Sequence, residues 1–519
     1  MIWHIFRKDW KLQWKFAAMI ALLQFATAAV LIKLGPIVDN PSLQTLWQLL
    51  TLATMVGIPF LIAAVVHQDA IPGARQDWLI RPIRRSDLLL AKFLFVLLAV
   101  HGPMLLADLI RGLAGGFSIR SSLAAAVSRG LFVLLSFSVP LFAFASLTKN
   151  AMEAIAGALI VFLSFAGFEM LVDQTLAGRM VVGSGGLSWI DGAAMTLAGL
   201  AGAAAVLSVQ YFRRRTILAR GLAAGAALLA MLCLFLPWNL AFAIQQRISP
   251  NPGAASAVAA YFDPEMGRFP FYRGSNGDSV NVYLPLRFGN LPADSALISD
   301  RAEIWLRDAS GASTRVGSRS GVSVRQETGV GKPAAYLQVN VPDDLYQRLQ
   351  DQLGQLEIDL SLTLFRSAGS HAIPALNGRA RFPELGGCVT RINAAETAVR
   401  VGCVPLEEMP ACAGLRLEHI PSGQVNPPQF QCQAGSYAPY FDALLVTPPP
   451  TRNVPFRDLS GLAKFPVDGS QLDQSQIVIE TYKEVDHFQR TVVIPSTRLK
   501  DWTAERARQV GPPPRAFDR

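Results

Sequence analysis

Apolar residues dominate the first 247 positions of the chain, whereas later positions alternate between apolar and polar residues. A helix that crosses a bilayer needs about 20 apolar residues, because it rises about 1.5 Å per residue. Seven runs of that kind predict membrane spans, at 16–32, 43–66, 88–110, 123–145, 152–172, 187–210 and 221–243. We therefore expect a polytopic α-helical membrane domain over residues 16–247.

Residues 1–15 combine aromatic and basic positions at helical spacing. The aromatic positions are Trp3, Phe6, Trp10 and Trp14, and the basic positions beside them are Arg7, Lys11 and Lys15. This pattern predicts an amphipathic helix in the membrane interface, with its rings at the level of the lipid headgroups. The apolar stretch that follows continues through Leu34, which favours an uncleaved first span over a cleaved signal peptide.

Basic residues near the span ends predict the orientation of the chain. With seven spans and the N-terminus inside, the cytoplasmic segments carry thirteen lysines and arginines, and the outer loops before the last span carry four. Lysine and arginine near span ends favour the cytoplasmic side. We therefore expect a protein of the bacterial inner membrane whose residues 248–500 lie outside the cytoplasm.

Residues 248–500 have the pattern of a β-rich domain. The segment LEIDLSLTLF, 356–365, alternates strictly between apolar and polar residues and predicts a half-buried strand. The segments NVYLPLRF, EIWL, YLQVNV, QIVIETY and TVVIP predict further strands. Such strands between Gly and Pro turns predict an antiparallel, sandwich-like fold. Residues 501–519 can bury little apolar surface and are expected to form a mobile tail.

Cysteines provide an independent indication of the compartment. Cys233 lies in the last predicted span, and the other four are Cys388, Cys403, Cys412 and Cys432. An even set in an oxidising compartment predicts two disulfides. Of the three connectivities we favour Cys388–Cys403 with Cys412–Cys432, because each pair brackets a plausible hairpin. The alternatives are four buried thiols in a cytosolic domain or a zinc site, although the usual ligand spacing of zinc is absent.

Ionisable residues within the predicted spans are few. Arg129 lies well inside the fourth span, where a charge costs ~3 kcal/mol on insertion scales. It therefore either pairs with Asp108, which lies toward the same leaflet, or extends to the lipid headgroups. Pro59, Pro103 and Pro140 are expected to kink their helices.

Motifs for catalysis in this chain are absent from the sequence. The nearest approach to a phosphate-binding loop is TGVGKPAAY, but Gln326 stands where that motif needs glycine, and Pro333 follows the lysine. The nucleophile elbow G-x-S-x-G and the zinc helix H-E-x-x-H are also missing, and the six histidines are scattered. We expect no catalytic residue, no metal site and no cofactor bound by this chain.

The segment HQDAIPGARQDWLIRPIRRSDLLLAK, residues 67–92, joins the second and third spans on the predicted cytoplasmic side. Its charged and half-apolar centre contains Arg75, Asp77, Trp78, Arg81, Arg84 and Arg85. The simplest interpretation is a solvated loop whose arginines fix topology and contact lipid phosphates.

This segment and IFRKDWKLQWK, before the first span, resemble the type-2 permeases of ATP-binding-cassette exporters over about residues 1–245. Asp69, Trp78, Arg81-Pro82 and Lys92 match positions that recur between the second and third spans of that family. The resemblance implies an interfacial N-terminal helix and a loop that couples the spans to a separate ATPase subunit.

The same resemblance implies the partners of the chain. They would be the ATPase subunit on the cytoplasmic face, which hydrolyses the ATP, a second permease copy or homologue, and membrane lipid, with no nucleic acid. The substrate is not predicted. The alternative function is that of a membrane-anchored sensor or binding protein that acts through its outer β domain.

Overall fold

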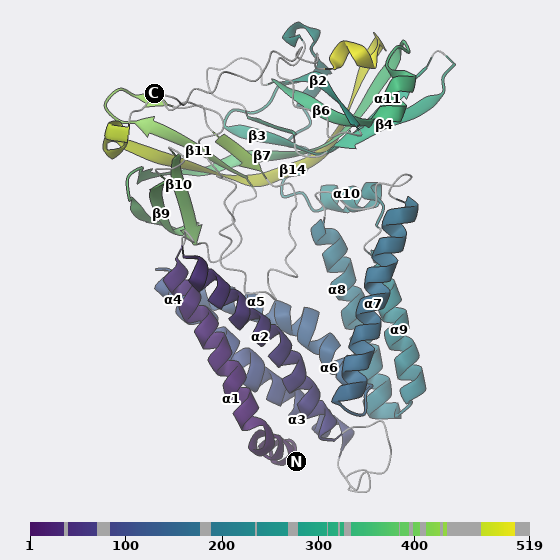
Figure 1. The fold of residues 1–519 in the computed structure, drawn as a ribbon, viewed down its shortest axis with the longest axis vertical. Coiled ribbons are helices and arrows are strands. Elements are labelled where there is room, and N and C mark those ends of the chain that lie inside the picture. The colour runs from purple at the N-terminus through teal and green to yellow at the C-terminus, as the bar shows by residue number, and fades with distance from the viewer. Residues whose placement is uncertain are drawn as a thin grey trace, which may run out of the picture.

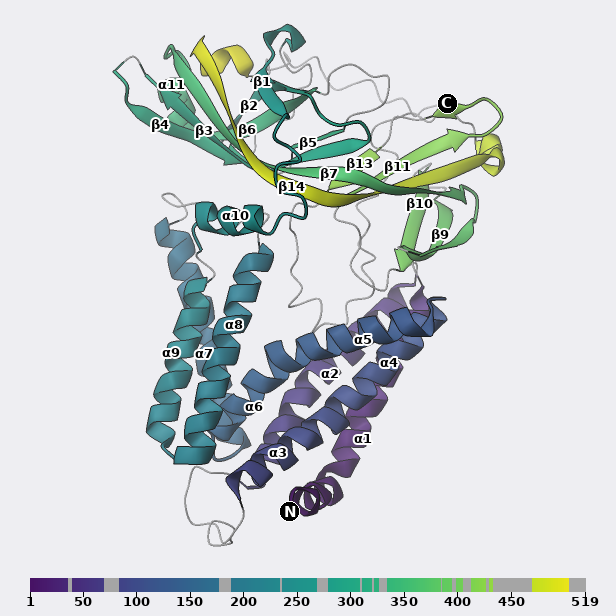
Figure 2. The same cartoon turned by 180° about the vertical axis from the view of Figure 1, so that it is seen from behind.

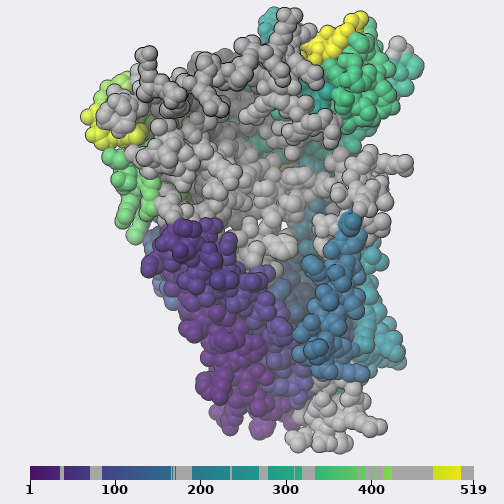
Figure 3. All heavy atoms as spheres, viewed as in Figure 1, coloured from purple at the N-terminus to yellow at the C-terminus, as the bar shows by residue number. Residues whose placement is uncertain are grey.

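The computed structural model describes residues 1–35, 40–69, 84–176, 188–233, 236–267, 279–308, 310–319, 322–325, 334–383, 385–393, 398–404, 412–425, 429–432 and 469–503. Figure 1 shows a helical part that carries the N-terminus and a β domain at the other end of the long axis. Figure 3 shows the same division in space-filling form, with the purple and blue helices below the green and yellow strands. The chain is thus a helical membrane part followed by a mainly-β domain, as the hydrophobic pattern predicts.

The helical part contains α1 (Ile2–Leu34), α2 (Pro41–His67), α3 (Arg85–Val96), α4 (Gly102–Ala114), α5 (Ile119–Val133), α6 (Val139–Ser146), α7 (Ala151–Leu176), α8 (Ser188–Leu207), α9 (Thr216–Cys233) and α10 (Trp238–Arg247). The π-helical segments η2 (Leu97–His101), η3 (Leu134–Ser138) and η4 (Ser208–Arg213) lie between or after them. Among the described residues, six helical segments are long and apolar enough to cross a membrane, and the apolar segment of α7, Ala151–Ser164, is shorter.

The interfacial helix and the first span are one continuous helix, α1, rather than two elements. Figure 1 shows the first turns of α1 running across the direction of the rest. The aromatic stripe divides between two environments. Phe6 is buried, whereas the rings of Trp3, Trp10 and Trp14 are exposed at the surface. Exposed tryptophans next to a membrane span are typical of the headgroup region.

Two of the three prolines coincide with π-helical turns. Pro103 follows η2 and Pro140 follows η3, so that α3–η2–α4 and α5–η3–α6 are each one long helix with a wider turn inside. Proline has no N–H and its ring collides with the carbonyl four residues earlier, and a π turn relieves that collision. Pro59, by contrast, lies inside α2 with no such turn.

The last predicted span, 221–243, is wrong at its C-terminal end. The helix α9 ends at Cys233, and Pro237 precedes a separate helix, α10. Proline fixes its own backbone and cannot continue a hydrogen-bonded helix, which explains the break. Figures 1 and 2 show α10 lying across the bundle axis, between α8 and the large sheet.

The β domain contains β1 (Ala259–Phe262), β2 (Ser279–Gly289), β3 (Ser295–Arg307), β4 (Ser313–Arg319), β5 (Val322–Arg325), β6 (Ala334–Pro342), α11 (Asp343–Leu349), β7 (Gly354–Pro374), β8 (Arg379–Phe382), β9 (Gly386–Asn393), β10 (Ala398–Val404), β11 (Cys412–His419), β12 (Gln424–Val425), β13 (Gln429–Cys432) and β14 (Ser475–Thr497). The 3-10 helices are η5 (Pro264–Met266), η7 (Gly469–Gln474) and η8 (Leu499–Trp502).

An eight-stranded antiparallel sheet forms the backbone of this domain. Its order is β12-β11-β14-β7-β3-β4, with β13 paired to β11 and β5 paired to β3. The sheets β1-β2-β6 and β10-β9-β8 pack against its two ends, on opposite faces (Figures 1 and 2). Each small sheet shares an apolar core with the large one, so each half of the domain is a two-layer sandwich.

The strand β7 contains the alternating segment 356–365. Its apolar side chains, Leu356, Ile358, Leu360, Leu362 and Leu364, are buried as predicted. The polar positions Ser361 and Thr363 are buried as well, because Trp238 of α10 contacts Ser361 and His487 of the neighbouring strand β14 contacts Thr363. The strand is therefore half-buried only over its first part.

A disulfide joins Cys388 and Cys403, which confirms the first predicted pair. The two residues are register partners in β9 and β10 with a Cα–Cα distance of 4.0 Å. Cys412 and Cys432 are likewise register partners, in β11 and β13, although their side chains lie outside the described residues. Cys233 is a free, partly buried cysteine.

Candidate functional site

The loop between the second and third spans begins and ends at described residues. Its centre, with Arg75, Asp77, Trp78 and Arg81, lies outside the described residues. Arg84 precedes α3, is exposed, and makes no side-chain hydrogen bond or ion pair with the described part of the chain. Arg85 donates a hydrogen bond to the carbonyl of Phe212 at the end of η4. Arg85 thus joins α3 to the end of η4 as well as carrying a charge.

A buried lysine lies at the point where this loop leaves the bundle. Lys92 of α3 is 1% exposed, and three oxygens from three segments surround its ammonium group. Its Nζ lies 3.0 Å from Asp9 Oδ2 of α1 and 2.7 Å from Asp69 Oδ2, just after α2. It also donates to the carbonyl of Val65 at 2.8 Å. An ammonium group has three N–H donors, and all three of these oxygens lie within 3.0 Å of it.

The charges at this junction balance. Lys8 donates to both oxygens of Asp69, at 2.8 and 2.9 Å, and its Nζ lies 3.8 Å from Asp9. Two lysines therefore face two aspartates, and Asp9 is fully buried. Burial opposes the ionisation of Asp69, but Lys92 and Lys8 outweigh it and hold its pKa below the usual range. We call these four residues, Lys8, Asp9, Asp69 and Lys92, the charged junction.

Aromatic side chains near Asp9 and Lys92 in the sequence pack against one another. Phe6 stacks with Trp3 and Trp10, with centroid distances of 5.0 and 5.9 Å. Phe95 of α3 contacts Phe6 and Trp10 at 6.3 and 5.8 Å. These contacts hold the first turns of α1 against α3.

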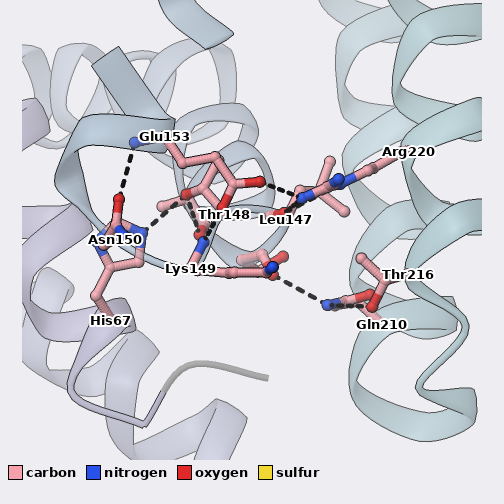
Figure 4. A network of polar contacts seen from close by, with 11 residues as sticks. His67, Leu147, Thr148, Lys149, Asn150, Glu153, Gln210, Thr216 and Arg220 are labelled. Atoms are coloured by element: carbon pink, nitrogen blue, oxygen red, sulfur yellow. Dashed lines mark hydrogen bonds and ion pairs between the residues drawn. The ribbon is translucent and has the colours of Figure 1, made fainter. Parts of the chain in front are cut away.

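A second polar network lies at the same end of the bundle, where α2 ends (Figure 4). His67 pairs with the hydroxyl of Thr148 at 2.8 Å, and Arg220 of α9 donates to the carbonyl of Leu147 at 2.9 Å. Arg220 also forms an ion pair with Glu153 of α7. Gln210 of η4 donates to the carbonyl of Ser146 at 3.1 Å. Together with the charged junction, this network ties α1, α2, α3, α6, α7 and α9 at one end.

The intramembrane arginine has a carboxylate partner. Arg129 of α5 donates to Asp108 of α4, so of the two alternatives left open by the sequence the ion pair is present. Arg111, one helical turn after Asp108, lies 3.5 Å from the same carboxylate. The three side chains line a cavity of about 50 Å³ together with Gln24, Thr27 and Thr51. Arg111 was not among the residues expected from the sequence, although its spacing of three residues from Asp108 was a usable signal.

A fourth polar cluster joins α10 to the large sheet. The indole N–H of Trp238 donates to Ser361 at 3.3 Å, and Arg301 lies over the same ring at 5.1 Å. Gln245 contacts His487 at 3.0 Å. These contacts connect the end of the helical part to β3, β7 and β14.

Two titratable groups are buried at that contact. Thr363 donates to Asp300 at 2.5 Å, and its hydroxyl lies 2.8 Å from His487 Nδ1. Burial raises the pKa of Asp300 to about 7, which the hydrogen bond from Thr363 only partly offsets. Burial also lowers the pKa of His487 to about 4, so the imidazole is neutral at pH 7. This cluster was not expected from the sequence.

The described residues contain no group of three or more His, Cys, Asp or Glu side chains arranged to hold a metal ion. Comparison with known proteins gives no further indication, since no family model and no curated protein matches the chain. We take the charged junction as the candidate functional site on its own geometry: two lysines and two aspartates, three of them buried, at the base of the loop 67–87.

Proposed function

We propose that this chain is the membrane-spanning permease subunit of an ATP-binding-cassette exporter. A separate ATPase subunit on the cytoplasmic face would bind and hydrolyse ATP, and a second permease copy or homologue would complete the transporter. The observation that carries the proposal is the charged junction. It attaches the root of the loop 67–87 to the N-terminal helix and to α3 through ion pairs in which Asp9, Asp69 and Lys92 are buried and Lys8 is partly exposed.

A coupling loop has to transmit force to the spans without bending at its root. Asp69 lies two residues after α2 and is held from both α1 and α3. A displacement of the loop would therefore move the ends of α1, α2 and α3 together. The π turns η2 and η3 lie further along the helices, where a wider turn offers a place for the spans to bend. Rocking of the spans about these turns is the proposed transport motion.

The arginine at the end of the loop offers a test of the ATPase contact. Arg84→Glu should reduce recovery of the co-expressed ATPase at least tenfold, because Arg84 is exposed and a reversed charge would repel an acidic docking surface. Arg84→Lys should retain the ATPase. Arg215→Glu, an exposed position on the link between η4 and α9, is the matched control. Wild-type recovery with Arg84→Glu would contradict this docking role and favour the alternative of a sensor or binding protein.

The proposed topology places the β domain outside the cytoplasm. Protease added to sealed, right-side-out spheroplasts should then cleave within residues 248–519, since that part would be accessible. The same protease should leave the loop 67–87 intact until the membrane is broken. Protection of the β domain in sealed spheroplasts would reverse the orientation, and with it the cytoplasmic placement of the loop.

A further inference from the structure

A basic pocket lies where the helical part meets the small sheet β8–β9–β10. It encloses about 410 Å³, which is the size of a small-molecule site. Its floor is formed by the ends of α1 and α4, at Leu31 and Ala114, and its far wall by β8 and β9. These helix ends coincide with the ends of two membrane spans, so the pocket lies at the level of the lipid headgroups.

The charge of the pocket is strongly positive. Arg111, Arg379 and Arg381 line it, and none of the described lining residues is a carboxylate. Arg111 contacts the carboxylate of Asp108, which it shares with Arg129. The C-terminal ends of α1 and α4 contribute roughly half a negative charge each. About two positive charges are therefore left without compensation in the described lining. A bound anion would neutralise them.

The backbone at the pocket rim is shaped around one of these arginines. Gly116 has φ +87°, and a Cβ at this position would lie 2.5 Å from Nε of Arg381. The positive φ favours glycine at this position, and the guanidinium of Arg381 lies directly against it. A Cβ added at Gly387 would lie 3.5 Å from the carbonyl oxygen of Gly115, so the two backbones run close together. The domains meet through glycines here, and Arg381 is set against a close-fitting backbone.

The lining divides into a charged side and an apolar side. The arginines belong to β8 and to the last turn of α4, whereas Leu31 and Ile32 of α1 form an apolar edge, with Ile32 41% exposed. Guanidinium groups bind phosphate oxygens in pairs of parallel hydrogen bonds, and they do so better than ammonium groups. An anionic phosphate group next to an apolar helix surface is the arrangement of a phospholipid headgroup with its acyl chain.

We propose that this pocket binds a phosphate-bearing anion and that its ligand in the membrane is the headgroup of an anionic phospholipid. The phosphate would lie between Arg379, Arg381 and Arg111, and the acyl chains would follow α1 and α4. Bound there, the lipid would bridge the membrane spans and the disulfide-linked sheet. This inference needs only that the helical part lies in a membrane, and it does not depend on the proposed transport function.

The test uses the purified full-length chain in detergent and measures thermal unfolding. The probes are short-chain phosphatidylglycerol, short-chain phosphatidylcholine and inorganic phosphate. Phosphatidylglycerol should raise Tm in a saturable way and more than phosphatidylcholine does. In Arg379→Gln/Arg381→Gln its apparent affinity should fall at least tenfold, because two charge-assisted contacts are lost. Saturable stabilisation by inorganic phosphate alone that is lost in the same variant would assign the site to a free anion instead of a lipid.

Two controls separate the site from general charge effects. Arg348→Gln/Arg498→Gln removes two exposed arginines at the opposite end of the β domain and should bind as wild type does. Arg379→Lys/Arg381→Lys keeps the charge and should retain part of the affinity, which also shows that the site tolerates substitution. Equal stabilisation of wild type and the glutamine variant by phosphatidylglycerol would overturn the proposal, as would no preference of the wild type for phosphatidylglycerol.

Discussion

Replacing Lys92 with alanine should lower the stability of the helical part by about 3–5 kcal/mol, the usual cost of removing one partner from a buried ion pair. The variant would leave Asp9 fully buried and without its nearest cation, 3.0 Å away in the wild type. It would also leave the carbonyl of Val65 without its donor. For a domain of this size the loss corresponds to a decrease in Tm on the order of 10 °C.

The matched control is Lys8→Ala. Like Lys92, Lys8 pairs with the carboxylate of Asp69, but its side chain is 45% exposed. In Lys8→Ala water can therefore solvate that carboxylate in place of the ammonium group. Exposed ion pairs contribute about 0–1 kcal/mol, and the expected change in Tm is correspondingly small. Thermal unfolding in detergent, followed by tryptophan fluorescence, measures both variants. Equal Tm values for Lys92→Ala and the wild type would mean that the junction contributes nothing to stability.

The membrane-spanning helices could be predicted from the sequence because each is indicated by the hydrophobicity of its own residues. An apolar run identifies a span whatever it packs against, and each of the first six predicted runs overlaps a helix or two helices joined by a π turn. The end of the last span was predicted wrongly because Pro237 was counted inside an apolar run, although proline is itself a local signal. The continuity of α1 was also missed, since the change from an amphipathic to an apolar pattern does not by itself end a helix.

Only part of the charged junction could be predicted from the sequence. Asp69 and Lys92 were identified through a resemblance to a family of exporters, whereas Asp9 was overlooked as one more charge in an interfacial helix. Its burial depends on α1 packing against α3, which the spacing of residues does not reveal. The first disulfide was predictable because a cross-strand pair in a hairpin is a short-range feature. The contact of Gln245 with His487 joins positions 242 residues apart, and no pattern in either segment indicates it.

The buried acid in the β domain should make the stability of that domain depend on pH. Asp300 has a pKa of about 7 in the folded chain, whereas an unfolded aspartate titrates near 3.9. Below about pH 4 Asp300 is protonated in both the folded and the unfolded chain, so it does not lower the free energy of unfolding. Between about pH 4 and 7 Asp300 loses its proton in the unfolded chain but keeps it in the folded chain. The free energy of unfolding therefore decreases as pH rises. The full difference of about three pKa units corresponds to about 4 kcal/mol above pH 7.

Asp300→Asn should therefore stabilise the β domain at pH 8 by up to about 4 kcal/mol and change it little at pH 4. Asparagine can still accept the hydrogen bond from Thr363, so the geometry is kept. His487, with its pKa lowered to about 4, has the opposite dependence, because its buried neutral form loses stability as pH falls from about 6.5. His487→Gln should accordingly flatten the acidic side of the profile and leave the alkaline side unchanged.

Thermal unfolding of the full-length chain from pH 4 to pH 8 measures these slopes. Glu484, whose pKa burial also raises, remains in every variant and leaves a common background slope. The comparison that matters is thus the difference between each variant and the wild type. If wild type and Asp300→Asn had parallel profiles over this range, Asp300 would have to be ionised in the folded chain at acidic pH. A counter-charge or water would then have to reach Asp300, and the contact between α10 and the sheet would not exclude solvent.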